Sequence, residues 1–272
     1  MKIIVSPAKK LDFERVSPSA KFTKPKFLGR SEVLIDTLRT YTCAEISKLM
    51  KLSDQLSELN FSRYRDFTTP FTRENAKQAV YAFKGDTYVG LDAESFDKDD
   101  IEYAQKSLRI LSGLYGILRP LDLIQPYRLE MGTRLKVAGK KNLYGYWQEV
   151  LTKEMNKELN KDGDKFLVNL ASKEYFSSLN FDELKVPVVT CHFMEKKGNT
   201  YKIISFKAKR ARGMMSQFII KNRIEDIEGL QKFNEAGYKF DPKASEAYDL
   251  VFKSSNWSLN QWEWFQEIVL EF

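Results

Sequence analysis

Apolar residues recur at helical spacing along several parts of the chain. Positions 31–59 carry leucine, isoleucine, valine and methionine three and four residues apart, with a break near Thr42 and Cys43. This spacing predicts two amphipathic helices. The same pattern predicts helices over 97–114, 144–159 and 207–223, and Thr72 is placed to cap a short helix that ends near residue 77.

Shorter runs of β-branched and aromatic residues predict the strands. These runs cover 2–5, 79–83, 165–170, 186–193, 200–206 and 248–252. The polar sequence EKKGN over 195–199 separates two of them and predicts a β-hairpin. Residues 60–70 contain no comparable pattern and are predicted to form a loop.

The segment 111–135 breaks both periodicities. It contains Gly113, Gly116, Gly132, Pro120 and Pro126. Glycine permits close backbone approach and proline fixes φ, so we predict a rigid, irregular shelf. We expect the shelf to present backbone N–H groups and two arginines to an anionic partner, with two tyrosines available for stacking.

Composition is typical of a globular protein with a sizeable core. Of 272 residues, 43% are hydrophobic and 30% are charged, and no linker or low-complexity tract divides them, which favours one domain. No stretch approaches the roughly 20 apolar residues of a membrane span. The two cysteines, Cys43 and Cys191, lie far apart, as expected in a reducing compartment. We therefore expect a cytoplasmic protein.

The net charge of +7 is unevenly distributed. Residues 196–223 contain nine lysines and arginines and no acidic residue, and residues 1–30 carry eight basic and two acidic side chains. Such polarity favours an anionic partner, of which nucleic acid is the commonest in the cytoplasm. A solvated basic face accounts for the charge equally well.

Several kinds of chemistry find little support. One histidine, His192, and two distant cysteines cannot form the usual zinc or transition-metal sites, so no metal and no cofactor are predicted. His192 follows Cys191 in a predicted strand, where adjacent side chains point to opposite faces, so we read it as structural. The common phosphate-binding glycine loops are absent from the sequence.

Polar residues collect instead where predicted strands and helices meet. Ser6 and Lys9 follow the first strand, and ligand groups often gather at such junctions in α/β folds. Local turns, caps and ion pairs explain each junction taken alone. Lys84 and Asp86 are the candidate catalytic residues. The candidate anion-binding residues are Lys9, Lys10, Lys84, Gly113, Tyr115, Gly116, Arg119, Tyr127, Arg128, Asn169, Ser172, Lys207, Lys209, Arg210 and Arg212.

Five strings carry a resemblance to a known family. They are IVSPAK (4–9), AFKGDTYVGL (82–91), LSGLYGILRPLDLIQPYRLEMG (111–132), NLASKEYF (169–176) and ISFKAKRARGMMSQFII (204–220). In order and approximate spacing the chain resembles the YaaA-type peroxide-stress family of bacterial cytoplasmic proteins over residues 1 to about 253.

The resemblance implies a single mixed α/β domain of unusual topology, with a central sheet, surrounding helices and a basic cleft. It implies induction by peroxide, sequence-independent binding of duplex or branched DNA in that cleft, and a role in limiting damage by free iron. A small anionic ligand in the cleft is a further candidate partner. The family's helix-hairpin-helix-like element maps here to the helix over 97–111 and the turn at 112–116.

The resemblance leaves alternatives open. The expected domain covers 1–253, and the tryptophan-rich extension 254–272 departs from the family pattern and receives no function. A DNA-binding protein without chemistry of its own is favoured over an enzyme that acts on a nucleotide or nucleic acid with Asp86 as general base. Direct iron sequestration is disfavoured by the few histidines and cysteines.

Overall fold

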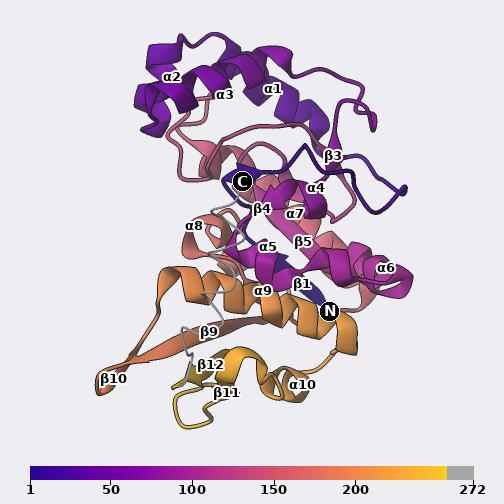
Figure 1. Ribbon diagram of the computed structural model, residues 1–272, viewed down its shortest axis with the longest axis vertical. Helices are drawn as coiled ribbons and strands as arrows, with labels where there is room; N and C mark the ends of the chain where they lie inside the picture. The colour runs from indigo at the N-terminus through magenta and orange to yellow at the C-terminus, as the bar shows by residue number, and fades with distance from the viewer. Residues whose placement is uncertain (256–272) are drawn as a thin grey trace.

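The structure is a computed structural model and describes residues 1–255. It is a mixed α/β fold in which helices surround a central, mostly parallel sheet (Figure 1). The sheet has eight strands, in the order β11-β12-β9-β8-β1-β5-β6, with β10 paired to β9. Strands β5, β1, β8, β9 and β12 run parallel, whereas β6, β10 and β11 are antiparallel to their neighbours.

The strands of this sheet are short except for β9. Their bounds are β1 (Lys2–Val5), β5 (Leu108–Ser112), β6 (Gly116–Leu118), β8 (Leu167–Leu170), β9 (Val188–Lys197), β10 (Thr200–Lys202), β11 (Tyr238–Phe240) and β12 (Asp249–Ser254). Two small antiparallel pairs lie outside it: β2 (Lys10–Leu11) with β4 (Phe83–Lys84), and β3 (Lys77–Gln78) with β7 (Leu123–Ile124).

The helices vary in length from one turn to five. They are α1 (Leu28–Arg39), α2 (Cys43–Met50), α3 (Asp54–Asp66), α4 (Ala79–Ala82), α5 (Asp86–Leu91), α6 (Lys98–Ser107), α7 (Leu143–Asp162), α8 (Lys173–Phe176), α9 (Ser205–Asn222) and α10 (Ile227–Gln231). Figure 1 shows α1, α2 and α3 grouped at one end of the molecule, while α10 and the strands β10 to β12 lie at the other. None of the helices in residues 1–255 has the length and apolar character needed to cross a bilayer.

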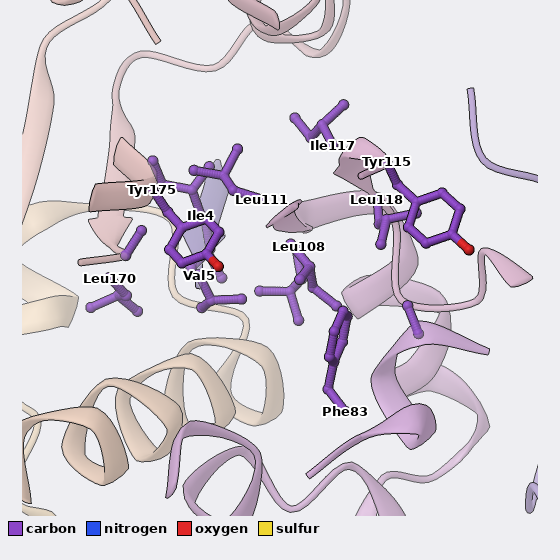
Figure 2. Close-up of a cluster of buried hydrophobic side chains, with 14 of the residues drawn as sticks. Ile4, Val5, Phe83, Leu108, Leu111, Tyr115, Ile117, Leu118, Leu170 and Tyr175 are labelled. Atoms are coloured by element: carbon purple, nitrogen blue, oxygen red, sulfur yellow. The ribbon is translucent and has the colours of Figure 1, made fainter. Parts of the chain in front are cut away.

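The core is centred on β1. Ile3, Ile4 and Val5 are completely buried, because parallel strands flank β1 on both edges and helices cover the sheet. Figure 2 shows the side chains of Ile4 and Val5 among those of the neighbouring strands and the shelf. This packing fixes where β1 ends and therefore where the polar residues after it emerge.

Much of the predicted secondary structure is confirmed. The strands at 2–5, 165–170 and 248–252, the hairpin around 195–199 and the helices at 144–159 and 207–223 all appear, with small shifts at their ends. These elements have strong periodicity or a clear turn sequence. The tryptophan-rich end after residue 255 lies outside the described residues.

Other predictions were wrong. The helix predicted over 97–114 ends at Ser107, because residues 108–112 pair with β1 as strand β5. The strand predicted over 79–83 is instead the short helix α4, followed by β4. The helix predicted at Thr72 is a turn. The second of the two helices predicted within 31–59 is itself two helices, because Lys51 adopts a left-handed conformation at φ 53° and ends α2. The next helix, α3, continues to residue 66, so most of the loop predicted over 60–70 is helical.

Candidate functional site

The candidate site lies where three parallel strands end side by side. Strand β1 pairs with β5 on one edge and β8 on the other, so residues after Val5, Ser112 and Leu170 emerge at the same edge of the sheet. In the sheet, β5 lies beside β1 and β9 lies beside β8, so the two flanking strands are on opposite sides of the β1–β8 pair. Open α/β sheets bind ligands at such switch points. The segment Ser6–Lys10 follows β1 and forms the centre of this site.

Ser6 ties the segment to two neighbours. Its Oγ accepts a hydrogen bond from the backbone N–H of Ser172 at 2.9 Å, and its carbonyl accepts one from the Tyr88 hydroxyl at 3.1 Å. Burial raises the pKa of Tyr88 well above its usual value, so this phenol stays protonated and donates at neutral pH. The junctions at residues 6 and 172, which lie far apart in the sequence, are therefore in contact.

The turn at 84–86 packs against the same segment. In the antiparallel pair of β2 and β4, Lys10 lies opposite Lys84, and both lysines are exposed. Gly85 lies against Ala8, since a Cβ on Gly85 would stand 3.4 Å from the Ala8 Cβ. Two like charges at opposed positions of a β pair repel each other. Asp86, the first residue of α5, is half-buried.

Glu130 links the shelf to the segment. Its Oε2 contacts the Lys9 Nζ at 2.9 Å, and its Oε1 accepts a hydrogen bond from the Arg128 Nη2 at 3.2 Å. The Lys9 side chain is 61% exposed, whereas that of Arg128 is only 18% exposed. Lys9 and Arg128 thus share one carboxylate at the sheet edge.

Helix α9 joins the site through a close crossing with α5. A Cβ on Gly213 would lie 1.9 Å from the Thr87 carbonyl oxygen, and one on Gly90 would lie 2.1 Å from the Arg210 carbonyl oxygen. Two facing glycines therefore let the helix backbones touch. This crossing places Arg210 and Lys84 in the lining of one surface pocket of about 530 Å³.

The four basic residues that begin α9 have different environments. Lys209 is exposed, and Lys207 pairs with the buried carboxylate of Glu195 at 3.2 Å. Arg212 lies near Cys191, and burial lowers its pKa. The cluster therefore divides between solvent-facing and structural positions, which its sequence did not indicate.

Some predicted site residues belong to the core instead. Tyr115 is completely buried and its hydroxyl accepts a hydrogen bond from the Gln125 N–H at 3.0 Å, so it cannot stack on a base. Tyr127 is 5% exposed and its hydroxyl lies 2.7 Å from the Ser112 Oγ. Gly113 packs on the Leu129 carbonyl, and Gly116 at φ 72° packs on Trp147. The prediction that the two tyrosines stack on a partner was wrong.

Two other candidates are engaged locally. Arg119 binds Asp122, with Nη2 to Oδ1 at 2.8 Å, and lines a different pocket, with Arg109 and Glu158. Asn169 is buried, and its Oδ1 accepts a hydrogen bond from the Ala171 N–H at 3.0 Å. Both contacts lie within a turn. Local turns and ion pairs were the alternative to ligand binding in the sequence analysis.

The helix-hairpin-helix-like element was placed wrongly. Residues 112–116 connect β5 to β6, which pair antiparallel, so they form the turn of a β-hairpin. The cause is the same as for the shortened helix α6, namely that the apolar run 108–112 is drawn into the central sheet. A helix pair does occur at α2 and α3, joined by residues 51–53.

Comparison with known proteins identifies the family. The family model described as peroxide stress protein YaaA matches residues 1–244. The chain belongs to the peroxide stress protein YaaA family. Curated relatives named UPF0246 protein support this assignment. One from Alteromonas mediterranea is 52% identical over 252 residues, which cover 93% of this chain and 97% of the relative.

Relatives from other bacteria are equally similar. A UPF0246 protein from Aliivibrio fischeri is 52% identical over 253 residues, covering 93% of this chain and 98% of its own length. Another, from Flavobacterium psychrophilum, is 50% identical over 252 residues, covering 93% and 99%. The YaaA-type resemblance drawn from the five strings is therefore confirmed.

The structure adds residues that the sequence did not single out in this YaaA-family chain. Arg63 on α3 interacts electrostatically with Arg128, although the two lie on separate elements. Glu174 accepts a hydrogen bond from the Gly132 N–H at 2.9 Å, beside the shelf. Arg63 stands at no motif, whereas Glu174 lies within the string NLASKEYF but was not chosen as a site residue; only the fold brings both to the site.

His192 and Cys191, the residues suited to metal-binding or thiol chemistry, are neighbours on β9. Within residues 1–255 there is no group of three or more His, Cys, Asp or Glu side chains arranged to hold a metal ion. His192 contacts Asp249 through Nε2 at 2.9 Å, across the parallel pair of β9 and β12. Burial raises the pKa of Cys191 to about 12, which leaves its thiol protonated at neutral pH.

Proposed function

We propose that this YaaA-family protein binds duplex or branched DNA in the cytoplasm, without sequence preference, through a basic surface centred on Ser6–Lys10. The observation that supports this proposal best is the opposed pair Lys10 and Lys84. Like charges at opposed positions of a β pair disfavour each other, and the Asp12 carboxylate, which interacts with Lys84, offsets at most one of the two. A phosphate backbone is a partner that would neutralise the remaining charge.

Other side chains extend the proposed surface. Lys9 precedes Lys10 and pairs with Glu130, and Arg210 shares with Lys84 a pocket that Asp12, Asp92 and Glu94 also line. Lys209 is exposed one residue earlier on α9. Contacts of this kind go to phosphates and carry no sequence information, so they favour binding that depends on backbone shape and charge.

The helix pair α2 and α3 is our candidate for the family's helix-hairpin-helix-like element. Its connecting residues include Lys51, and Lys48 is also exposed near the end of α2. These two exposed lysines are suited to a phosphate, whereas the start of α3 is capped by Ser53 and carries Asp54 in its first turn. We propose that this pair makes a second contact with the DNA backbone.

The proposal is tested by measuring duplex affinity against salt concentration. The variant Lys10→Gln/Lys84→Gln/Lys209→Gln removes three exposed charges from the proposed surface. We expect weaker binding and a shallower salt dependence, because each lost phosphate contact reduces the slope of log K against log salt by about 1. The same slope measured with Lys48→Gln/Lys51→Gln tests the helix pair.

The matched control is Lys153→Gln/Lys157→Gln/Lys185→Gln. These three exposed lysines line a pocket at the C-terminal half of α7 and leave the variant with the same net charge. We expect its affinity and salt slope to stay close to those of the unmodified protein. Equal losses in both triple variants would mean that net charge alone attracts the DNA, and would contradict the proposed surface.

Protection from iron-linked oxidative damage is the physiological part of the proposal. We propose that it acts at the DNA, by covering it. A plasmid exposed to ferrous iron and hydrogen peroxide should be nicked less when the protein is bound. The triple variant of the proposed surface should protect poorly, and the control variant should protect as well as the unmodified protein. Equal protection by both would show that DNA binding is not its cause.

An enzyme acting on a nucleotide or nucleic acid is the second candidate. The position of Asp86 and Lys84 beside the carboxyl end of β1 favours it, since α/β enzymes bind substrates there. Asp86 would act as general base and Lys84 would hold a phosphate. Turnover of nucleotides or DNA that disappears in Asp86→Asn would support this function, and its absence would favour binding alone.

A further inference from the structure

Arg128 has a hydrogen-bond donor that no group within residues 1–255 accepts from. A guanidinium carries five N–H donors, and the side chain of Arg128 contacts Glu130 through Nη2. Its Nε is buried and has no hydrogen-bond partner within residues 1–255. Leaving a donor of a charged group buried and unpaired is costly. The Nε–H of Arg128 can therefore donate a hydrogen bond to an acceptor that residues 1–255 do not supply.

Arg63 approaches it from α3. The next residue, Tyr64, donates a hydrogen bond from its hydroxyl to the Arg128 carbonyl, which fixes α3 against the shelf. Arg63 is half-buried, and its Nη1 donates to the neutral Asn60 Oδ1 at 3.4 Å. Within residues 1–255 no carboxylate forms an ion pair with Arg63. Burial and the neighbouring charge of Arg128 both lower the pKa of Arg63.

The charges in this cluster do not balance. Lys9 and Arg128 share Glu130, and Arg63 adds a third cation near Arg128. Glu174 lies nearby but is engaged by the backbone of Gly132 at 2.9 Å. Three cations therefore lie near two carboxylates, of which Glu130 alone forms ion pairs with them within residues 1–255. Displacing Glu130 leaves an excess of two positive charges, which matches a phosphate monoester with its about −1.5 to −2 charges at pH 7 and its oxygens that fit guanidinium forks.

We propose that Arg63, Arg128 and Lys9 form a site for a terminal phosphate monoester, and that Glu130 competes with this phosphate for Arg128. The phosphate belongs to a DNA 5′ end or to a free mononucleotide, since both present the same dianion. A site for DNA 5′ ends rests on the proposed DNA-binding function, whereas a site for a free mononucleotide does not. An internal phosphodiester carries one charge and is the weaker match.

The DNA form is tested with a hairpin duplex that carries either a 5′-phosphate or a 5′-hydroxyl, by fluorescence polarisation. We expect the phosphorylated hairpin to bind at least about tenfold tighter, the size of one charge-assisted hydrogen bond. Arg63→Gln should abolish this preference, and Arg63→Lys should retain part of it. Equal affinity of the two hairpins would exclude a site for DNA 5′ ends.

Arg65→Gln is the matched control. Arg65 lies on the same helix and carries the same charge, but it is exposed and stacks on Phe61 with its guanidinium carbon 3.3 Å from the ring centroid. We expect this variant to keep the preference for the 5′-phosphate. If Arg63→Gln and Arg65→Gln weaken both hairpins to the same extent, Arg63 acts only through general charge and the proposal is wrong.

Glu130→Gln separates a ligand site from a structural ion pair. Removing the competing carboxylate should raise affinity for the phosphorylated hairpin, whereas loss of a purely structural contact would lower it or leave it unchanged. Thermal unfolding of each variant verifies that it remains folded. A lower affinity in folded Glu130→Gln would contradict the proposed competition.

The free form is tested by equilibrium dialysis with deoxyadenosine 5′-monophosphate and with deoxyadenosine. Binding of the monophosphate alone, lost in Arg63→Gln and kept in Arg65→Gln, would support the phosphate site even if the protein bound no DNA. Monophosphate binding without any DNA binding would refute the proposed DNA-binding function and would still support the phosphate site. Absence of both monophosphate binding and a 5′-phosphate preference would overturn the inference.

Discussion

The backbone N–H of Ser172 donates a hydrogen bond to the Ser6 Oγ at 2.9 Å, joining residues 166 positions apart. This contact closes the edge of the sheet where β1 and β8 end. It also fixes the start of the Ser6–Lys10 segment, from which the proposed basic surface extends. The position of the proposed surface therefore depends on the Ser6 side chain.

Replacing Ser6 with alanine should loosen this edge. The Ser172 N–H loses its acceptor, and an unpaired donor that is partly buried costs about 1–3 kcal/mol. We expect Ser6→Ala to lower the free energy of unfolding by that amount in urea titrations. Ser62→Ala, at an exposed position of α3, should change it by less than about 0.5 kcal/mol. Equal stabilities of the two variants would show that the contact contributes little.

The crossing of α5 and α9 should not accept a methyl group. A Cβ on Gly213 would lie 1.9 Å from the Thr87 carbonyl oxygen, so the helices must separate. We expect Gly213→Ala to destabilise the protein by about 1–3 kcal/mol or more, measured by thermal and denaturant unfolding.

Gly145→Ala provides the control of opposite sign. Gly145 lies in α7, where the atom nearest to an added Cβ is 3.6 Å away. Because alanine favours a helix over glycine, we expect a gain of up to about 1 kcal/mol. A loss in Gly145→Ala as large as that in Gly213→Ala would show that the close crossing is not the cause.

The pairing of Lys2 with Asp162 should make stability depend on acidity. The hydrogen bond from Lys2 is the main cause that lowers the pKa of Asp162 below its usual value of 3.8. A lowered pKa in the folded state means that the contribution is complete above the unfolded pKa and is lost as the pH falls through the folded value. We expect the stability difference between the unmodified protein and Asp162→Asn to shrink between about pH 5 and about pH 2.

A double-mutant cycle tests the origin of that pH dependence. In a Lys2→Met background, Asp162→Asn should have little effect at neutral or acid pH, because the partner is gone. Denaturant titrations at several pH values supply the free energies. A pH-dependent effect that persists without Lys2 would assign the lowered pKa of Asp162 to another group.

The two cysteines should differ sharply in reactivity. Burial raises the pKa of Cys191 to about 12, and the thiolate is the reactive form, so this thiol should resist alkylation and peroxide. Cys43 is partly exposed at the start of α2. We expect mass spectrometry after brief iodoacetamide treatment to find label on Cys43 only. Comparable native labelling of Cys191 would contradict its burial, and denaturation should make both sites react.

Local patterns predicted the elements whose signals were strong. The amphipathic stripe of α7 and the turn sequence before Thr200 each led to the correct structure. The apolar run 108–112 did not, because leucine and isoleucine suit a helix or a buried strand equally. Its pairing with β1, where Ile4 lies opposite Arg109, decided the outcome. Such pairing is formed between distant segments and leaves no local periodicity.

The site could be predicted only in part, because local sequence shows where strands end but not which side chains are buried. Ser6, Lys9 and Ser172 stand at strand ends, and strand ends are recognisable. Tyr115 looked equally suitable, but its ring lies in the core, as Figure 2 shows. Arg63 had no motif and was not singled out. Whether a polar residue faces a ligand or fills the interior depends on neighbours that the local sequence does not contain.

The sequence by itself determined the family, the polarised charge, most of the long helices and the hairpin around 195–199, because these follow from the order and spacing of residues. Only the tertiary structure decided that Lys10 lies opposite Lys84 and that Tyr64, next to Arg63, donates a hydrogen bond to the Arg128 carbonyl. Contacts between distant segments depend on how apolar faces are buried together. That burial is a property of the whole chain, so no single stretch of sequence encodes it.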